Sequence, residues 1–179
     1  TQLDLSRRGP PIGDRPGHPD WIIGFHTRHR NKLGVTINLR TEEGKDLIKR
    51  LIAVSDVVME NMTAGAMKRL GLGYEELRKI RPDLVMLSVS NIGQTGPLST
   101  TSAYSPCSGA ISGLETLVGY EGEGTLGSTT AFLDPITALY GTFAILTALE
   151  HKAKTGEGQY IDATLVETGI SLTAEPLLD

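Results

Sequence analysis

The sequence predicts an α/β fold in which a parallel sheet is flanked by helices. The main observation is the alternation along residues 33–90, where three apolar strand-like segments are separated by helical segments. Hydrophobic residues make up 39% of the 179 residues and charged residues 21%, which is typical of a folded globular domain. A chain of this length can also bury a core of its own.

The first 30 residues differ in composition from the rest of the chain. They are polar and rich in Pro, Gly and Arg, so we expect 1–30 to be a connecting loop and 31–179 to be a folded large domain. The chain starts on this loop and ends directly after a helical segment. We therefore expect it to be a piece of a longer protein.

The alternation begins with the segment 33–39, LGVTINL, in which apolar residues occupy every second position and predict a strand. Thr41 then predicts the N-cap of a helix that extends to about residue 55, with two glutamates in its first turn. The apolar run at 56–60 predicts a short buried strand. These segments form the first strand–helix–strand unit.

The remaining elements continue this alternation up to residue 90, after which the amino-acid composition changes. Two short helices are expected to end at Gly71 and before Pro82. Residues 98–130 are rich in Ser, Thr and Gly and predict mostly loop. The expected elements are helices at 63–70, 74–80, 107–117 and 135–152, strands at 83–90 and 159–166, and a last helix after them.

Several classes of protein are disfavoured by bulk properties. A net charge of −4 and a pI near 5.6 argue against a nucleic-acid partner. The longest apolar-rich run, 136–149, is too short to span a bilayer comfortably, so no membrane association is expected. The single cysteine, Cys107, suits a reducing compartment, which indicates a cytoplasmic protein, and it is expected to be a small core thiol.

No cofactor motif is present in the sequence. The glycine cluster at 119–127, GYEGEGTLG, lacks the strand-to-helix context of a dinucleotide fingerprint, and its carboxylates would repel a pyrophosphate. We therefore expect no nicotinamide cofactor. The four histidines lack partners at metal-ligand spacings, so no metal is expected either.

One carboxylate stands in an otherwise apolar stretch, AFLDPITALY at 131–140. Asp134 followed by Pro135 suits an N-cap followed by the first helical residue. The positive end of the helix dipole also favours an ionised carboxylate, as covalent carboxylate catalysis requires. The local sequence therefore permits both a capping residue and a nucleophile.

Five stretches carry a combined signature. They are NKLGVTINLRTEEGKDLIKRLI at 31–52, SDVVMENMTAGAMKRLGLGYEEL at 55–77, NIGQTGP at 91–97, SAYSPCSGAISGL at 102–114, and LDPITALYGTFAILTALEHKAKTGEGQYIDATL at 133–165. In this order the stretches resemble the class III CoA-transferases, the formyl-CoA and carnitine CoA-transferase type. The resemblance implies a Rossmann-like parallel sheet, an interlocked homodimer or related heteromer, and a full length about twice that of this chain.

The resemblance also implies an activity, that of an enzyme of the EC 2.8.3 type. Asp134 falls where these transferases place their nucleophilic aspartate. Its carboxylate would attack an acyl-CoA thioester to give a mixed anhydride and then an aspartyl-CoA thioester, from which CoA passes to an acceptor carboxylic acid. The implied substrates are therefore an acyl-CoA, which brings coenzyme A, and a carboxylic acid.

A CoA site is implied by the same resemblance. Residues 37–40 match a nucleotide-binding segment, 61–63 match a loop that lines CoA, Arg69 matches a cation at its phosphates, and 102–105 match a segment beside the pantetheine arm. Without the family, Arg40 and Arg69 would be read as solvated surface residues. The implied residues are Ile37, Asn38, Leu39, Arg40, Asn61, Met62, Thr63, Arg69, Ser102, Ala103, Tyr104 and Ser105.

Two departures from the family pattern bear on the activity. Ser102 stands where formyl-CoA transferase has a lysine, which puts one phosphate contact in doubt. Tyr104 and Ser105 stand where the related acyl-CoA racemases carry a His-Asp pair, and a phenol is a poorer acid–base group than an imidazole near neutral pH. This difference favours a transferase over a racemase. A non-catalytic CoA-binding subunit is the other alternative, and the presence of Asp134 argues against it.

Overall fold

The structure is a computed structural model that describes residues 7, 22–101, 103–128, 130–176 and 178. The chain divides into two compact units, Thr1–Thr36 and Ile37–Asp179. The described part of the first unit contains α1 (Ile23–Arg28), where an irregular segment is expected from the sequence. The assignment of 1–30 as a connecting loop stays a prediction.

The expected strand at 33–39 is wrong. Residues 32–38 form no helix or strand, and Leu33 and Val35 are exposed. An alternating pattern describes a strand only where a neighbouring strand supplies hydrogen bonds and a core covers its apolar face. Among the described residues no strand pairs with this segment, so the pattern alone does not make it a strand.

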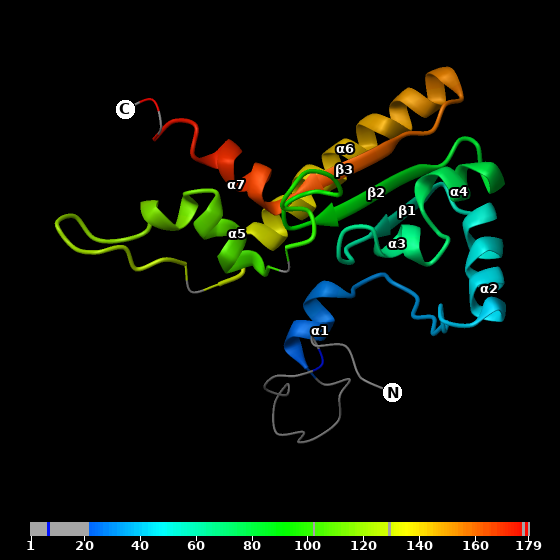
Figure 1. The fold of residues 1–179 in the computed structure, drawn as a ribbon, viewed down its shortest axis with the longest axis horizontal. Helices are drawn as coiled ribbons and strands as arrows, with labels where there is room; N and C mark the ends of the chain where they lie inside the picture. Colours follow the sequence, from blue (N-terminus) through cyan, green and yellow to red (C-terminus); the bar gives the residue numbers. More distant parts are fainter. Residues whose placement is uncertain (1–6, 8–21, 102, 129, 177, 179) are drawn as a thin grey trace. The chain divides into compact units, whose positions relative to one another are not determined.

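The second unit is built on a parallel sheet in the order β1-β2-β3 (Figure 1). Its strands are β1 (Val57–Glu60), β2 (Val85–Ser90) and β3 (Tyr160–Thr164). β1 and β3 both pair with β2 in parallel, so β2 is the central strand. These pairings confirm the predicted α/β fold with a parallel sheet.

One face of the sheet is covered by α2 (Glu42–Ala53) and α4 (Tyr74–Ile80). Thr41 caps α2 as expected, because its side-chain oxygen accepts a hydrogen bond from the Gly44 N–H at 3.1 Å. The buried core between these helices and β2 consists of Ile52, Leu72, Leu77, Leu84 and Met86.

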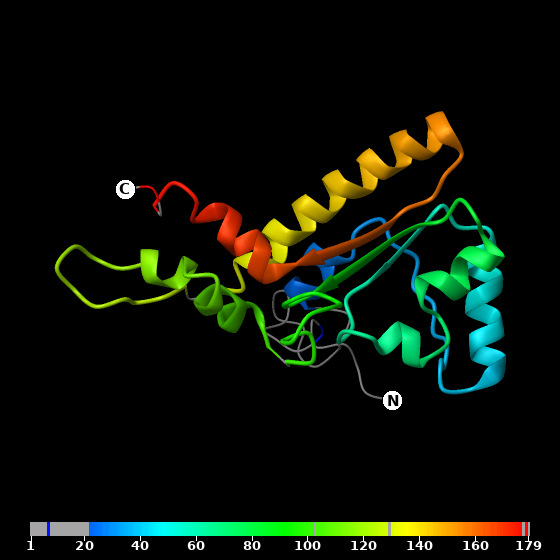
Figure 2. The same cartoon turned by 45° about the horizontal axis from the view of Figure 1, so that its top comes forward.

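The long helix α6 (Leu133–Thr155) covers the other face and packs against β2 and β3 (Figure 2). Leu87, next to Met86 on β2, points to this face because side chains alternate along a strand. A Cβ atom at Gly141 would lie only 2.9 Å from Leu87 Cδ2, so glycine allows α6 to approach the sheet closely.

Shorter elements complete the second unit. α3 (Ala66–Arg69) and α7 (Leu165–Leu172) are separate helices, and the expected helix at 107–117 is divided into α5 (Ser105–Ile111) and the 3-10 helix η3 (Leu114–Leu117). The division falls at Gly113, whose φ of 81° lies in the left-handed region and ends α5.

A cluster of charges holds the C-terminal end of α6 to the starts of β1 and β2. Lys152 Nζ lies 2.7 Å from Asp83 Oδ2 and 3.3 Å from Asp56 Oδ1. The Arg81 guanidinium contacts the same two carboxylates at 2.8 Å each. Hydrogen bonds from Arg81 and Lys152 hold the pKa of Asp83 well below its ordinary value.

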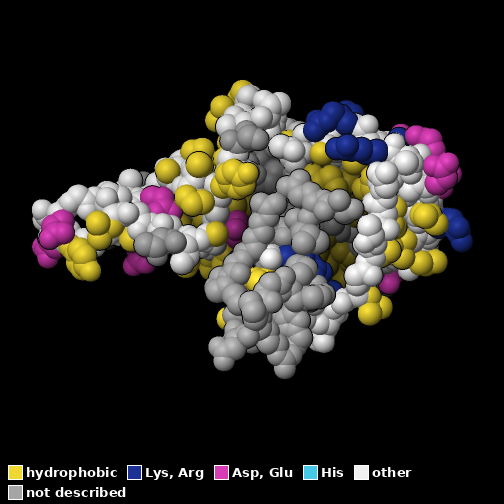
Figure 3. Space-filling view, turned by 90° about the horizontal axis from the view of Figure 1, so that it is seen from below, with side chains coloured by type: hydrophobic (Ala, Val, Ile, Leu, Met, Phe, Trp, Pro, Cys, Tyr) yellow, Lys and Arg dark blue, Asp and Glu magenta, His cyan; other side chains and the backbone are white. Residues whose placement is uncertain are grey.

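The structure leaves large apolar side chains exposed on several elements, and Figure 3 shows patches of such side chains on the face that it views. On α6 they include Leu139, Phe143 and Leu146, the second of them 74% exposed. These residues are spaced to share one side of the helix. No described helix is long and apolar enough to cross a membrane.

The charge cluster makes the stability of the protein depend on pH in a defined direction. A carboxyl with a lowered pKa stabilises the fold above the ordinary aspartate pKa of about 3.9 and loses this contribution as pH falls toward its folded pKa. We expect Asp83→Asn to lower the unfolding free energy of the full-length protein by about 1 kcal/mol or less at neutral pH. The difference from wild type should narrow below about pH 4.

Urea unfolding at about pH 7 and pH 3 measures both effects. The matched control is Glu75→Gln, which removes an exposed pair with Arg78 at 3.8 Å and should change stability little. A difference between Asp83→Asn and wild type that stays constant over this pH range would contradict the assignment.

Candidate functional site

The topology places Asp134 at the edge of the sheet where the strands end. Lys152, near the C-terminal end of α6, contacts Asp83 just before β2 begins. α6 therefore runs opposite to the strands, and its first turn lies toward their carboxyl ends. In open parallel sheets this edge is the usual place for ligands.

Asp134 is not the N-cap of this helix, contrary to one of the two expectations. α6 begins at Leu133, so Asp134 is its second residue and Pro135 its third. Phe132 is the N-cap position, and its φ of −63° and ψ of −39° are already helical. The exposed Asp134 side chain therefore lies in the first turn, where the helix dipole still favours its ionised form.

The residues around Asp134 are buried unevenly. Leu133 is buried and lies near Gly169 of α7, so it belongs to the core. Phe132 is exposed. Thr137, one turn further along α6, is fully buried, and its hydroxyl has no hydrogen-bond partner among the described residues. Within the described part of the chain, Asp134 is thus open to solvent.

Two side chains fix the 61–65 loop, which follows β1. The Glu60 carboxylate accepts from the Met62 N–H at 2.7 Å, and Gln94 Oε1 accepts from the Gly65 N–H at 2.9 Å. Arg69 Nη1 donates to the Ala64 carbonyl at 3.2 Å, which brings the guanidinium to the same loop. The structure therefore groups Asn61, Met62, Thr63 and Arg69, all of them exposed.

The 37–40 segment forms a turn rather than the end of a strand. Asn38 Oδ1 accepts from the Arg40 N–H at 3.1 Å, and the Asn38 carbonyl accepts from Thr41 N at 3.2 Å. Leu39 packs against the same core as Met67 of α3, and Ile37 is half-buried. Asn38 and Arg40 remain exposed beside the start of α2.

The segment before α5 is tied to the end of β2 through Asn91. Asn91 Nδ2 donates to the Ala103 carbonyl, and Asn91 Oδ1 accepts from the Ser108 hydroxyl at 3.1 Å. Tyr104 is 80% exposed, whereas Ser105 is buried. Ser102 lies outside the described residues. The Asn91 carbonyl also accepts from Val166 N at 3.0 Å, so this residue joins β2, α5 and α7.

Sequence reasoning missed the side chains that support the site. Glu60, Asn91, Gln94 and Asp162 all lie at the carboxyl edge and hold loops there; the Asp162 carboxylate accepts from the Gln94 N–H at 2.9 Å. Their partners are far apart in the sequence and give no local pattern. The available signal was their position, since Glu60 and Asp162 lie in strands, Asn91 directly follows β2, and Gln94 lies in the loop after it.

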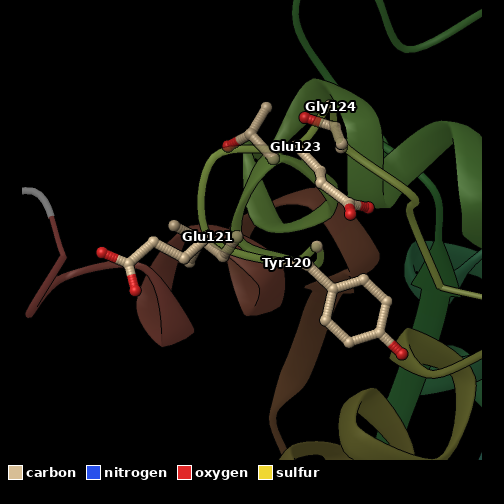
Figure 4. A pocket seen from close by; sticks show the side chains of 8 residues that line it. Tyr120, Glu121, Glu123 and Gly124 are labelled. Atoms are coloured by element: carbon tan, nitrogen blue, oxygen red, sulfur yellow. The ribbon is translucent and has the colours of Figure 1, made fainter.

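A shallow hollow in the 116–125 loop is a separate feature (Figure 4). Its labelled side chains do not converge, because Tyr120 and Glu121 point in different directions. The two carboxylates of this loop, Glu121 and Glu123, do not suit a phosphate-bearing ligand. Within the described parts of the chain, no group of three or more His, Cys, Asp or Glu residues could hold a metal ion.

The fold and the edge cluster define an α/β protein with a candidate ligand site at the carboxyl ends of its strands. The chain belongs to CoA-transferase family III, whose family model matches residues 2–179. This match confirms the resemblance drawn from the sequence motifs.

Individual relatives agree with the family. The beta subunit of succinyl-CoA–L-malate CoA-transferase from Chloroflexus aurantiacus is 43% identical over 165 residues, which cover 92% of this chain and 40% of the relative. Human succinyl-CoA:glutarate CoA-transferase is 36% identical over 143 residues, 80% of this chain and 33% of the relative. The chain thus spans about a third to two-fifths of these relatives.

The fold agrees with a solved structure of the same family. A CAIB/BAIF family protein from Brucella suis superposes with a TM-score of 0.84 at 35% identity, over 88% of this chain and 42% of the other. This agreement supports the parallel sheet and its flanking helices as family features.

The Asn91 contacts lead to a stability prediction. Asn91→Ala leaves the fully buried Ser108 hydroxyl without its acceptor and should lower the unfolding free energy of the full-length protein by about 1–3 kcal/mol. Asn61→Ala, at an exposed position, is the matched control and should stay within about 0.5 kcal/mol of wild type. Equal stability of the two variants in urea unfolding would contradict the linking role of Asn91.

Proposed function

We propose that the protein containing this chain is a CoA-transferase that moves CoA between an acyl-CoA thioester and a carboxylic acid. The observation that carries the proposal is the position of Asp134 in the first turn of α6, on the edge that also holds the 61–65 loop. Family membership supports a CoA thioester as the substrate. The exposed carboxylate is the candidate nucleophile.

The proposed reaction keeps the thioester energy within covalent intermediates. A carboxylate oxygen of Asp134 attacks the thioester carbonyl carbon, and the C–S bond breaks. This step releases CoA thiolate and forms an acyl-aspartyl anhydride. The thiolate then attacks the aspartyl carbonyl carbon and releases the donor acid. An acceptor carboxylate attacks the carbonyl carbon of the aspartyl-CoA thioester, the C–S bond breaks, and CoA thiolate leaves behind an anhydride between Asp134 and the acceptor. The thiolate then attacks the acceptor acyl carbon of this anhydride, which forms the new acyl-CoA and expels the Asp134 carboxylate.

We propose that CoA lies along the exposed residues of the carboxyl edge. Arg69 is suited to a phosphate because its guanidinium is always charged and is fixed against the 61–65 loop. Residues 37–40 would contact the nucleotide, and Asn61, Met62 and Thr63 would line the molecule. Ala103, Tyr104 and Ser105, with Ser102, would lie beside the pantetheine arm.

The names of the relatives suggest which substrates to test first. Several are named for succinyl-CoA as the donor, while the named acceptors differ and include L-malate, glutarate and D-citramalate. We therefore propose succinyl-CoA as the donor and a dicarboxylic acid as the acceptor.

We also propose that the protein works as a homodimer or related heteromer. The exposed apolar side chains of α6, such as Leu139, Phe143 and Leu146, support this proposal because a surface of this kind is usually covered in the working protein. The relatives named as alpha and beta subunits support a multi-chain assembly.

The covalent step can be tested by mass spectrometry. The full-length protein is incubated with succinyl-CoA, quenched in acid and analysed intact and after proteolysis. We expect an adduct of CoA less one water on the peptide containing Asp134. Asp134→Ala should abolish the adduct and lower transfer to dicarboxylic acids by about a thousandfold or more, since it removes the nucleophile.

The matched control is Asp46→Asn, which changes an exposed carboxylate on α2 and should retain both the adduct and the activity. Full turnover by Asp134→Ala would contradict the mechanism. Exchange of the α-proton with solvent deuterium, without exchange of the acid, would contradict the transferase assignment and indicate a racemase.

A further inference from the structure

We propose that Gln94 is a positioning residue that holds the 61–65 loop in the conformation that receives CoA. This inference rests on the proposed function. Gln94 lies in the loop after β2, and its side chain reaches a loop that follows a different strand, β1. It is separated from Gly65 by 29 residues in the sequence, so the contact exists only in the folded protein.

Gln94 makes one hydrogen bond through its backbone to β3 and another through its side chain to the 61–65 loop. Its own N–H donates to Asp162 Oδ2 on β3 at 2.9 Å, and its side-chain Oε1 accepts from the Gly65 N–H at 2.9 Å. Asp162, Gln94 and Gly65 thus form a continuous link from β3 to the loop after β1. The link crosses the carboxyl edge of the sheet.

The 61–65 loop needs such support because its local structure is weak. Gly65 has a φ of 73°, in the left-handed region, and precedes α3, which has only four residues. A helix this short does not persist by itself in water. α3 ends at Arg69, the candidate phosphate-binding residue. The backbone conformation at Gly65 therefore sets the direction of α3 and the position of Arg69.

The loop is fixed at two points while its side chains stay exposed. The Glu60 carboxylate, only 8% exposed, accepts from the Met62 N–H, and Gln94 accepts from the Gly65 N–H. Asn61, Met62 and Thr63 lie between or beside these points and face solvent. A backbone fixed by side-chain acceptors, with its own side chains exposed, is pre-organised for a ligand, because less ordering remains for binding.

Within the part of the chain that the structure describes, the position of the Gln94 side chain leaves part of its amide without a hydrogen bond. Its Nε2 atom is buried and has no hydrogen-bond partner among the described residues. A buried unpaired donor is costly and calls for an explanation. The explanation offered by the contacts is that Oε1 must reach Gly65, which fixes the orientation of the whole amide.

The test compares three variants of the full-length protein. Gln94→Met keeps the length of the side chain and removes the acceptor, whereas Gln94→Glu keeps an acceptor for the Gly65 N–H. Ser99→Ala is the matched control, because it removes a hydrogen bond to Gly96 within the same connection and leaves Gln94 unchanged. Hydrogen exchange of the Gly65 amide reports the loop, and calorimetry with free CoA reports binding.

We expect Gln94→Met to speed exchange at Gly65 by about tenfold and to weaken CoA binding by about 5- to 15-fold, as the loss of one hydrogen bond implies. The maximal rate should change less than the KM for succinyl-CoA. Gln94→Glu should keep exchange at Gly65 within about twofold of wild type, because it keeps the acceptor, whereas its added negative charge should weaken the binding of CoA phosphates. Ser99→Ala should keep both exchange at Gly65 and CoA affinity within about twofold of wild type.

Two results would overturn the inference while leaving the proposed function intact. One is unchanged exchange at Gly65 in Gln94→Met; the other is faster exchange with wild-type CoA affinity. If the wild-type protein binds no CoA and forms no Asp134 adduct, the proposed function fails, and the inference about CoA falls with it. Exchange at Gly65 reports the link itself independently of CoA.

Discussion

The close approach of α6 to the parallel sheet is the constraint on which the rest of the second unit depends. Gly141 of α6 permits close contact with Leu87, and in the connection from α6 to β3 a side chain at Gly158 would collide with the backbone of Asp83 and Leu84. The charges around Lys152 hold the far end of the helix. With one end and the middle fixed, the first turn of α6 has to lie at the carboxyl edge, and Asp134 lies there with it.

The carboxyl edge combines exposed candidate site residues with a supporting set of hydrogen bonds. The support consists of polar groups at strand ends, such as Glu60, Asn91 and Asp162, which accept or donate hydrogen bonds to loop backbones. The exposed set contains Asp134 and Arg69. Because rigid strands hold the support, the loops keep a defined geometry without a ligand, which is the physical basis for proposing a binding site there.

The sequence correctly predicted structural elements that depend on neighbouring residues. Its predictions were wrong where an element depends on contacts with residues far away in the sequence. Thr41 caps α2 as expected, because a cap depends only on the next three residues. The strand expected at 33–39 is absent, because pairing requires a partner that periodicity does not supply. Asp134 was identified as a site residue, but α6 starts one residue before it. The sequence did not predict the contact between Gln94 and Gly65, because the two residues are 29 positions apart.

The most direct test of the central claim is a crystal structure of the full-length protein with CoA bound. We expect the CoA sulfur to lie about 3–4 Å from the Asp134 carboxylate, within attacking distance, and CoA to pass the 61–65 loop with a phosphate at Arg69. CoA bound away from the carboxyl edge, with its sulfur far from Asp134, would contradict the claim.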